Sequence, residues 1–375
     1  MSFFQNHSSW PLVELKNIAT LKRGYDLPTK LRVEGEVPIY AANGRNGTHD
    51  EVKIKGPGVI TGRSGTIGKV HYTEDDYWPL NTALYVTNFH GNDPRWVYYM
   101  LSAFKLERYV EGAGVPTLNR NLVHDELIPL PPLDEQKRIA AILDKADAIR
   151  QKRKQAIALA DEFLRSVFLE MFGDPVTNPK GWEVKEVSTV CTEIVDCVNR
   201  TAPTVDYETP YKMIRTTNVR DKKINLSETR YVEFETYKLW IRRLKPQKGD
   251  LIFTREAPAG EAGVIETDDF IFLGQRTMHF RPDQTLIHPV FLLHELTASG
   301  VKRQIVKLSA GSTVTHLSVP ECKKFLIRVP SIAKQLPFVN LVRELDKKVN
   351  RSKESLLDSD SLFNALSQKA FSGQL

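Results

Sequence analysis

Some short motifs in this chain come close to nucleotide-binding or catalytic patterns. The segment Gly65-Thr66-Ile67-Gly68-Lys69 resembles a phosphate-binding loop, in which backbone N–H groups and a lysine hold phosphates. That pattern requires a glycine five positions before its second glycine, where this chain has Arg63. It also requires a serine or threonine after the lysine, where this chain has Val70. The sequence therefore predicts no nucleotide-binding loop here.

Metal-dependent and methyl-transfer motifs are incomplete in the same way. His294-Glu295 begins a zinc-protease pattern, but Ala298 stands where the second histidine is required. Glu51-Val52-Lys53 and Glu183-Val184-Lys185 have the Glu-x-Lys spacing of Mg²⁺-dependent nucleases without a convincing Pro-Asp pair upstream, so we interpret them as solvated strand edges. Asn178-Pro179-Lys180 approaches the motif that clamps a flipped base and departs from it at the third residue. We predict no catalytic residue and no metal site.

The side chains best suited to reading DNA lie in glycine- and asparagine-rich breaks between short β-runs. Arginine matches guanine O6 and N7, asparagine matches adenine N6 and N7, and Ser, Thr and Lys hold phosphates. We predict DNA contacts from Asn43, Arg45, Arg63, Ser64, Thr66 and Lys69 in the first half, and from Arg215, Asn218, Arg255 and Arg276 in the second. The alternative stays open that each is an ordinary hairpin residue, because asparagine and glycine relieve positive φ at turns.

Composition bounds the class of protein. The chain has 375 residues, and its 52 Lys and Arg against 46 Asp and Glu give a formal net charge of +6. This modest excess suits a polyanionic partner, although many basic proteins bind no nucleic acid. A hydrophobic content of 41% is enough for more than one buried core, so we expect two globular units.

Cysteine usage and the N-terminal sequence predict a soluble protein of the reducing cytoplasm. Cys191, Cys197 and Cys322 are odd in number and have no C-x-x-C spacing, which indicates neither a disulfide framework nor a zinc site. The N-terminus lacks a basic region followed by a long apolar run, and no stretch approaches the roughly 20 apolar residues of a membrane span. We therefore expect no membrane contact.

The chain contains a long internal repeat, and repeats of this size decide architecture before any local motif does. The matched pairs are Trp10–Leu15 with Trp182–Val187, Gly58–Arg63 with Asp250–Arg255, and Gly112–Leu118 with Gly311–Leu317. Both members of the second pair are predicted to be a strand that ends in an arginine loop. We predict two globular domains, at residues 1–130 and 174–330.

A long helix is predicted after each globular domain, at residues 131–173 and 331–375. Apolar and small residues recur in alternating four- and three-residue steps, interrupted by Arg150 and Arg153, which is typical of a coiled-coil seam. Positions 199 residues further on repeat the seam in the second half. The predicted seam or partner-facing residues include Ile139, Leu143, Leu164 and Val167 in the first helix and Phe338, Val342, Phe363 and Leu366 in the second.

The ends of these helices can also be predicted. The first should end at Gly173, because Asp174-Pro175 cannot continue a helix, and the second should end near Gly373. At about 1.5 Å per residue, each helix would be roughly 55 to 60 Å long. A different interpretation is that both are long amphipathic helices buried in broad cores. The expected fold class is α/β (α+β), with two globular domains separated by two long helices that form an antiparallel coiled coil.

Two parts of the chain resemble the DNA specificity (S) subunits of Type I restriction-modification systems. Pro129–Asp144, together with Met171–Asp174, resembles the central conserved region of that family. Pro210–Val219 and Gly249–Pro258 are similar to one of its target-recognition domains. The resemblance covers nearly the whole chain. Val329–Gln335 is a weakened copy of the first conserved segment, so we expect a partner to dock there more weakly or differently.

The resemblance implies a non-catalytic subunit that binds an asymmetric, bipartite target in double-stranded DNA, with one half-site for each domain. The two helices would pack antiparallel as a spacer and would also dock partners. Those partners would be two modification subunits, which bind S-adenosylmethionine and methylate an adenine in each half-site, and restriction subunits, which use ATP and Mg²⁺ for translocation and cleavage. No cofactor is expected in this chain.

Two other hypotheses remain open. A self-sufficient DNA-modifying enzyme would transfer a methyl group from labelled S-adenosylmethionine without partners. A stand-alone DNA-binding regulator would bind its specific site tightly by itself, whereas a specificity subunit should need its modification partners for full affinity.

Overall fold

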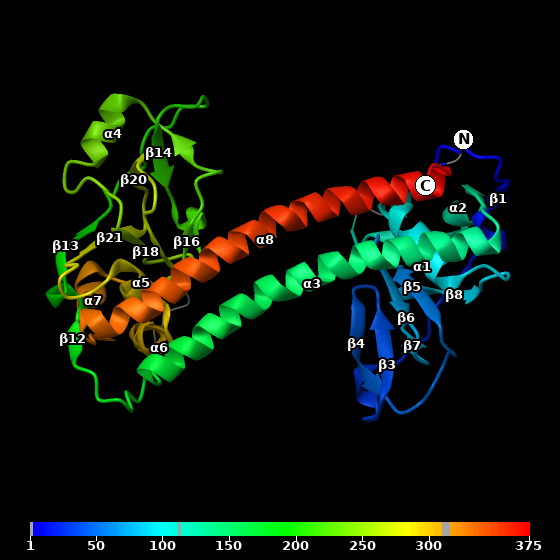
Figure 1. The fold of residues 1–375 in the computed structure, drawn as a ribbon, viewed down its shortest axis with the longest axis horizontal. Helices are drawn as coiled ribbons and strands as arrows, with labels where there is room; N and C mark the ends of the chain where they lie inside the picture. The colour runs from blue at the N-terminus through cyan, green and yellow to red at the C-terminus, as the bar shows by residue number, and fades with distance from the viewer. Residues whose placement is uncertain (1–2, 112–113, 310–315) are drawn as a thin grey trace. The chain divides into compact units, whose positions relative to one another are not determined.

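The computed structural model describes residues 3–111, 114–309 and 316–375 of the chain (Figure 1). These residues form two compact units. The first unit comprises the described residues of Met1–Ala156 and Ser352–Leu375, and the second comprises those of Ile157–Arg351. Of the repeated segments at Gly112–Leu118 and Gly311–Leu317, residues 112–113 and 311–315 lie outside the described residues.

The first unit is built on a four-stranded antiparallel sheet with a smaller sheet beside it. The strand order of the larger sheet is β2 (Thr20–Arg23), β8 (Ala83–Asn88), β5 (Gly58–Gly62), β6 (Val70–Thr73). The smaller sheet has the order β4 (Gly44–His49), β3 (Val37–Ala41), β7 (Trp78–Pro79), in which β3 and β7 are parallel. Two-stranded pairs join β1 (Leu12–Glu14) to β11 (Leu127–Pro129), and β9 (Val110–Glu111) to β10 (Thr117–Leu118).

Short helices close the core of this unit. Pro94 begins α1 (Pro94–Ala103), and the side chain of Asp93 caps it by accepting a hydrogen bond from the N–H of Trp96 at 2.8 Å. The indole of Trp96 is fully buried beneath the sheet. The remaining short helices are α2 (Arg120–His124) and the 3-10 turns Leu15–Asn17, Thr29–Leu31 and Leu106–Tyr109.

The second unit repeats this arrangement with different strand lengths. Its four-stranded sheet has the order β13 (Cys191–Asp196), β21 (Thr277–Pro282), β18 (Leu251–Thr254), β19 (Ala262–Val264). Its three-stranded sheet has the order β17 (Arg230–Tyr231), β14 (Tyr211–Ile214), β20 (Phe270–Leu273), with β14 and β20 parallel. The pair β12 (Val184–Glu186) and β22 (Leu326–Arg328) corresponds to β1 and β11.

Helices of the second unit follow the same plan, with insertions. Pro289 begins α5 (Pro289–Thr297), which corresponds to α1 and is followed by α6 (Ser299–Leu308). A reciprocal capping box between Ser318 and Glu321 begins α7 (Val319–Lys323). The hairpin of β15 (Val219–Arg220) and β16 (Lys223–Ile224), the helix α4 (Phe234–Trp240), and the 3-10 turns Val187–Thr189 and Thr216–Asn218 complete the unit.

Two long helices, α3 (Leu133–Phe172) and α8 (Ile332–Ser372), run through both units, as the sequence predicts. Gly173 and Gly373 follow their last residues with φ values of +78° and +73°, the left-handed conformation that ends many helices. Both predicted helix ends are therefore confirmed. Among the described helices, none combines the length and the apolar composition that crossing a membrane requires.

Within the first unit the two helices lie side by side and antiparallel. Arg150 of α3 forms a 3.0 Å ion pair with Asp360 of α8 and stacks over the ring of Phe363. Arg153 donates a 2.7 Å hydrogen bond to the carbonyl oxygen of Ser355. The two arginines that interrupt the apolar pattern therefore join the helices, because their long side chains reach across from the edge of the seam.

The predicted seam residues all face inward, but the helix ends are buried more broadly than a two-helix seam requires. In the first unit Ile139 and Leu143 are fully buried in the core that contains α1, and Phe363 and Leu366 pack against the same core. The second unit buries Phe338 and Val342 in its own core, where Leu164 and Val167 also pack. Each globular core thus incorporates the start of one long helix and the end of the other.

A glutamine fixes the start of each long helix by the same hydrogen bonds. Gln136 accepts from the N–H of Asp93 at 2.9 Å and donates to the carbonyl oxygen of Pro131 at 2.9 Å. Gln335 accepts from the N–H of His288 at 2.8 Å and donates to the carbonyl oxygen of Pro330 at 2.7 Å. The segment that the sequence shows as a weakened copy therefore keeps this helix-positioning contact.

Candidate nucleic-acid interface

Loops of the first unit meet at one end of its four-stranded sheet. The N–H groups of Arg63 and Ser64, just after β5, donate to the carbonyl oxygen of Thr82 at 2.8 and 3.1 Å. The carbonyl oxygen of Arg63 accepts from the N–H of Leu118 at 2.8 Å. Because these are backbone hydrogen bonds, they do not use the side chains of Arg63, Ser64 and Thr82, which stay available for other contacts. We call Arg63, Ser64, Asn81, Thr82 and Thr117 the first loop cluster.

The guanidinium of Arg63 is hydrogen-bonded through its Nε. Its Nε donates to the carbonyl oxygen of Asn81 at 2.8 Å, and the residue is partly exposed. Within the part of the chain that the structure describes, its two Nη nitrogens make no hydrogen bond. A guanidinium anchored through Nε keeps a pair of parallel donors, which matches the two acceptors of a guanine edge.

The turn between β3 and β4 lies next to this cluster. The N–H of Ala42 reaches the hydroxyl oxygen of Thr82 at 3.4 Å, and the next residue, Asn43, is exposed. Arg45 is also exposed and lies opposite Tyr40 in the β3–β4 pair. The structure thus brings Asn43 and Arg63 to the same end of the domain, with Arg45 on the adjoining strand.

Thr66 and Lys69 lie further along the loop that joins β5 to β6. A Cβ atom on Gly62 would lie 1.7 Å from the carbonyl oxygen of Thr66, so glycine is required for the loop to fold back this closely. Lys69 is exposed, and its carbonyl oxygen accepts from the hydroxyl of Thr61 at 2.9 Å. Burial, helped by the nearby charge of Lys69, lowers the pKa of His71.

The second unit forms the corresponding loops with the corresponding backbone bonds. The N–H of Arg255, just after β18, donates to the carbonyl oxygen of Arg276 at 2.8 Å, and its own carbonyl accepts from Leu317 at 3.2 Å. The side chain of Arg255 is partly exposed and donates through Nη1 to the carbonyl oxygen of Leu317 at 3.2 Å. We call Arg255, Glu256, Arg276 and His316 the second loop cluster.

Charged side chains occupy the surface of the second loop cluster. Arg276 has a φ of +69° and 57% side-chain exposure, and its Nε forms a 3.1 Å ion pair with Oε2 of Glu256. The other carboxylate oxygen of Glu256 contacts Nδ1 of His316. Glu256 itself lies deeper, with 15% of its side chain exposed. One carboxylate therefore holds two exposed nitrogen-bearing side chains.

Asn218 and Arg215 share the loop after β14 but not the same surroundings. Asn218 is only 3% exposed, and its amide accepts from the N–H of Arg215 at 3.0 Å. It also donates to the carbonyl oxygens of Asn225 and Glu228, both at 3.2 Å. Arg215 is partly exposed, next to the point where the N–H of Gly274 bonds Ile214. In this structure Asn218 stabilises the loop from inside, whereas Arg215 reaches its surface.

No motif in the sequence marks Asn81, Thr82, Glu256 or His316 as a member of these surfaces. The loop of Gln275 and Arg276 attracts notice through its arginine, but the corresponding first-half loop has no arginine. The loop between β7 and β8 in the first unit corresponds to the loop between β20 and β21 in the second. Aligning these two loops pairs Thr82 with Arg276 and would have identified Thr82 as a loop residue of the first unit. His316 becomes a neighbour of Glu256 only through the fold, because 60 residues separate them.

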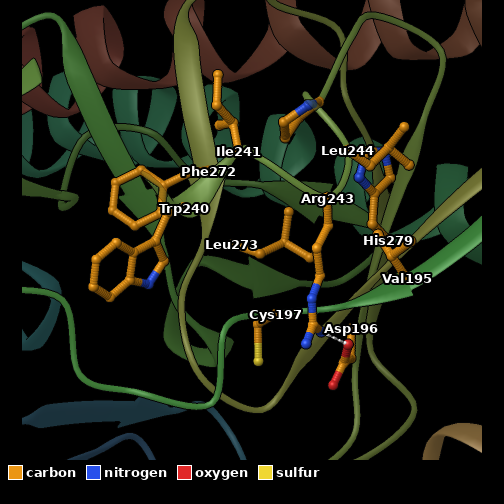
Figure 2. Close-up of a pocket in the computed structure, with 11 residues that line it drawn as sticks. Val195, Asp196, Cys197, Trp240, Ile241, Arg243, Leu244, Phe272, Leu273 and His279 are labelled. Carbon is orange, nitrogen blue, oxygen red and sulfur yellow. Dashed lines mark hydrogen bonds and ion pairs between the residues drawn. The ribbon is translucent and has the colours of Figure 1, made fainter. Parts of the chain in front are cut away.

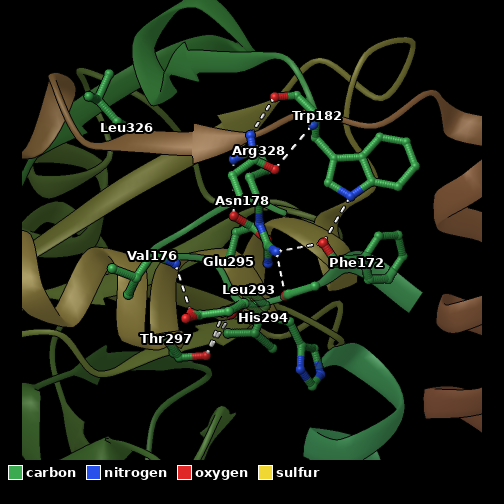
Figure 3. A network of polar contacts seen from close by, with 12 residues as sticks. Phe172, Val176, Asn178, Trp182, Leu293, His294, Glu295, Thr297, Leu326 and Arg328 are labelled. Atoms are coloured by element: carbon green, nitrogen blue, oxygen red, sulfur yellow. Dashed lines mark hydrogen bonds and ion pairs between the residues drawn. The ribbon is translucent and has the colours of Figure 1, made fainter. Parts of the chain in front are cut away.

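The residues of the incomplete zinc-protease motif are part of the core (Figure 3). Burial lowers the pKa of His294 to about 3, and its ring packs against Phe168 and Phe338. Glu295 accepts from Nε and Nη2 of Arg328 at 3.0 and 2.5 Å, and both side chains are at most 3% exposed. These residues stabilise packing, and within the described residues no group of three or more His, Cys, Asp or Glu is placed to hold a metal ion.

The pocket of Figure 2 lies in the second unit and is lined by residues that include Trp240, Arg243 and Asp196. Arg243 and Asp196 form an ion pair across its edge. Its volume of about 10 Å³ has room for about one water molecule, which is far too small for a nucleoside cofactor.

Comparison with known proteins points in one direction. A family model described as the Type I restriction modification DNA specificity domain matches residues 7–159. The Type I restriction enzyme EcoBI specificity subunit of Escherichia coli is 23% identical over 318 residues, 75% of this chain and 65% of that protein, so the match spans a little less than two thirds of its length. A putative Type I restriction enzyme specificity subunit of Haemophilus influenzae is 23% identical over 92% of this chain and 89% of its own.

Solved structures agree at the level of the fold. A crystal structure of the S subunit of a Type I restriction-modification system from M. genitalium has a TM-score of 0.65 and covers 98% of this chain and 97% of its own, with 14% sequence identity. The expected fold class, two β-rich domains with two long antiparallel helices, is therefore confirmed.

Proposed function

Because the chain belongs to the family of Type I restriction-modification DNA specificity subunits, we propose that it recognises a bipartite, asymmetric DNA target and thereby directs adenine methylation or cleavage by partner subunits. The observation that carries this proposal is the pair of loop clusters, which the same backbone hydrogen bonds build at the same end of equivalent sheets. Two equivalent surfaces with different side chains suit a target whose two halves differ in sequence.

In this proposal residues 1–130 and 174–330 are the two target-recognition domains, and residues 131–173 and 331–375 are the conserved helices. The first domain reads one half-site with Asn43, Arg45 and Arg63. The other recognition residues are Ser64, Thr66 and Lys69 in the first domain, and Arg215, Arg255 and Arg276 in the second. Asn218 acts indirectly, because its amide is fully used in holding the loop that presents Arg215. The length of unspecified DNA between the half-sites depends on the helices rather than on the loops.

The chemistry belongs to the partners of the chain. Subunits of this family are non-catalytic, and the cofactors reside on other subunits of the complex. We propose two modification subunits that bring S-adenosylmethionine, and restriction subunits that bring ATP and Mg²⁺. The site of action is the cytoplasm, where the DNA target is, and the three cysteines are free thiols there.

Selection from a random pool of duplex DNA tests this function even though the target sequence is unknown. The purified complex of this chain with its modification subunits should enrich two short conserved blocks separated by a spacer of fixed length and free sequence. Binding should weaken steeply with salt, since phosphate contacts release counterions. A single block, or no enrichment, would contradict the proposal.

The same preparation separates the two competing functions. Full affinity and the same enriched sequence for the chain alone would favour a stand-alone regulator. Methyl transfer from labelled S-adenosylmethionine by the chain alone would favour a self-sufficient enzyme. The proposal expects weak binding and no methyl transfer until the modification subunits are added.

A further inference from the structure

The second loop cluster has a geometry that the first does not. Arg276 and His316 are 57% and 62% exposed, and both contact the same carboxylate, whose side chain is only 15% exposed. A carboxylate offers only acceptor oxygens, so in this contact Nδ1 of His316 is the donor and Oε1 of Glu256 the acceptor. Each oxygen of Glu256 therefore fixes one of the two exposed side chains.

Equivalent positions of the first unit carry no ionisable groups. The shared backbone bonds pair Arg63 with Arg255, Thr82 with Arg276, and Leu118 with Leu317. By the same correspondence Ser64 matches Glu256 and Thr117 matches His316. Three hydroxyl side chains in one domain thus stand where an arginine, a glutamate and a histidine meet in the other. The backbone does not need these charges, because the first unit forms the same loops without them.

We propose that Arg276 reads one guanine of the second half-site and that Glu256 and His316 are the residues that position it. This inference rests on the proposed function and deepens it. The ion pair engages Nε of Arg276, which leaves the Nη1 and Nη2 edge of the guanidinium for two parallel hydrogen bonds to guanine O6 and N7. An arginine held before binding loses less rotamer entropy when it binds.

The charge of the Arg276–Glu256 pair favours a base over a phosphate. The positive charge of Arg276 and the negative charge of Glu256 offset each other, so this pair offers little net attraction to a phosphate. A planar pair of donors keeps its geometric match to guanine regardless of net charge. Because only 15% of the Glu256 side chain is exposed, arrangements in which Arg276 moves away from this carboxylate are also disfavoured.

The test uses the full chain in complex with its modification subunits and selection from random duplex DNA. Wild-type protein should show a strong preference for G·C at one position of the second half-site. Arg276→Lys and Glu256→Gln should each reduce that preference, by roughly 10- to 100-fold for the lysine variant, because lysine cannot form the bidentate pair. His316→Ala should reduce it less, since the ion pair of Arg276 remains. The first half-site should be unchanged in all three variants.

Asp269→Asn is the matched control. Asp269 also forms an ion pair in this unit, with Lys212 at 2.6 Å, but it lies before β20, whereas Arg276 lies beyond the other end of that strand. This variant should keep the full preference at every position. If Glu256→Gln proves unstable, Arg276→Lys still decides the question, because that side chain is exposed.

Three results would overturn the inference while leaving the proposed function intact. One is that Arg276→Lys shows the same base preference at the second half-site as the wild-type protein. Another is an equal fall in affinity for all sequences, with a salt slope smaller by about one, as expected for a lost phosphate contact. The third is a fall in thermal stability with no change in sequence preference, as expected for an internal brace. Absence of a bipartite motif in the wild-type selection would instead contradict the proposed function itself.

Discussion

The two units differ in how they hold the end of the long helix that docks on them. In the first unit the ring of Phe371, in the last turn of α8, packs 5.3 Å from Phe4 and 6.2 Å from Trp96, and the N–H of His7 donates to the carbonyl oxygen of Ser372 at 2.9 Å. In the second unit Arg328 donates to the carbonyl oxygens of Phe172 and Gly173 at 2.9 and 2.7 Å. Nε1 of Trp182 also donates to the carbonyl oxygen of Phe172 at 2.9 Å, so a buried arginine and an indole together satisfy free carbonyls at the end of α3 (Figure 3).

The strand pairs β1–β11 and β12–β22 show what replaces this arginine in the first unit. Leu12 lies opposite Pro129 and Val184 lies opposite Arg328, so Pro129 occupies the position of Arg328. The same strand pair therefore forms with Pro129 in one unit and with the charged Arg328 in the other. The second unit depends more on a single interaction, because a buried charge that loses its partner is costly.

The largest expected effect is the loss of that interaction. Arg328→Ala leaves Glu295 buried without its cation and should destabilise the second unit by about 3–5 kcal/mol. Hydrogen exchange measured along the chain should show faster exchange in the second unit, with the first unit unchanged. Arg138→Ala is the control: it removes an exposed ion pair, in which Nη2 of Arg138 lies 2.6 Å from Glu135, and should lower the free energy of unfolding by less than about 1 kcal/mol. Equal effects of the two substitutions would show that the buried pair contributes no more to stability than an exposed one.

Where the units agree, substitutions should cost the same. Gln136→Ala and Gln335→Ala each remove a buried amide that joins the start of a long helix to the cap of α1 or α5. Each should destabilise its own unit by about 1–3 kcal/mol, as expected when buried partners lose their hydrogen bonds. Denaturant unfolding of the two variants measures this. A clearly smaller cost for Gln335→Ala would mean that the second conserved segment is weakened in structure as well as in sequence.

A substitution in the loops of one unit should change DNA recognition at one half-site only. Arg63→Ala removes the exposed guanidinium edge of the first loop cluster and should cost about 1–3 kcal/mol of discrimination at one half-site. Binding to duplexes that carry substitutions in either half-site measures this discrimination. Equal loss at both half-sites would contradict the assignment of Arg63 to one of them.

The smallest expected effect concerns acid. Burial alone would raise the pKa of Asp250, but hydrogen bonds from His279 at 2.6 Å and from Arg281 at 2.9 and 2.7 Å outweigh it and lower that pKa. A lowered pKa gives stability that is present above the ordinary value of about 4 and is lost as the pH falls through the folded-state value. The matching residue of the first unit is Gly58, so that unit has no counterpart of this carboxylate.

Unfolding followed between about pH 5 and pH 2.5 would measure that dependence. Asp250→Asn should be less stable at neutral pH, and its second unit should show less further loss on acidification. A second unit that loses as much stability on acidification in Asp250→Asn as in the wild type would contradict this account of Asp250.

Features set by periodicity or by local chain stops could be predicted from the sequence. The helix ends at Gly173 and Gly373 follow from local chemistry, and the seam follows from residue spacing. The repeat predicts that the two halves share a topology, as the matching strand orders show. These features do not depend on which distant residues meet.

Contacts between distant residues could not be predicted. Arg328 and Glu295 are 33 residues apart, and nothing in either local segment indicates a buried pair. The residue type of Asn218 predicts an amide that reads DNA, but the carbonyl groups of Asn225 and Glu228 in a later turn hold this side chain inside the loop. Which loop side chains reach the surface is decided by such tertiary hydrogen bonds, and residue type does not reveal them.

Mapping of adenine methylation in cells that make the modification subunit, with and without this chain, tests the central claim most directly. The account predicts a bipartite motif, with two different half-sites and a fixed spacer, that is methylated when the chain is present and unmethylated when it is deleted. A methylome that does not change on deletion would contradict the specificity function.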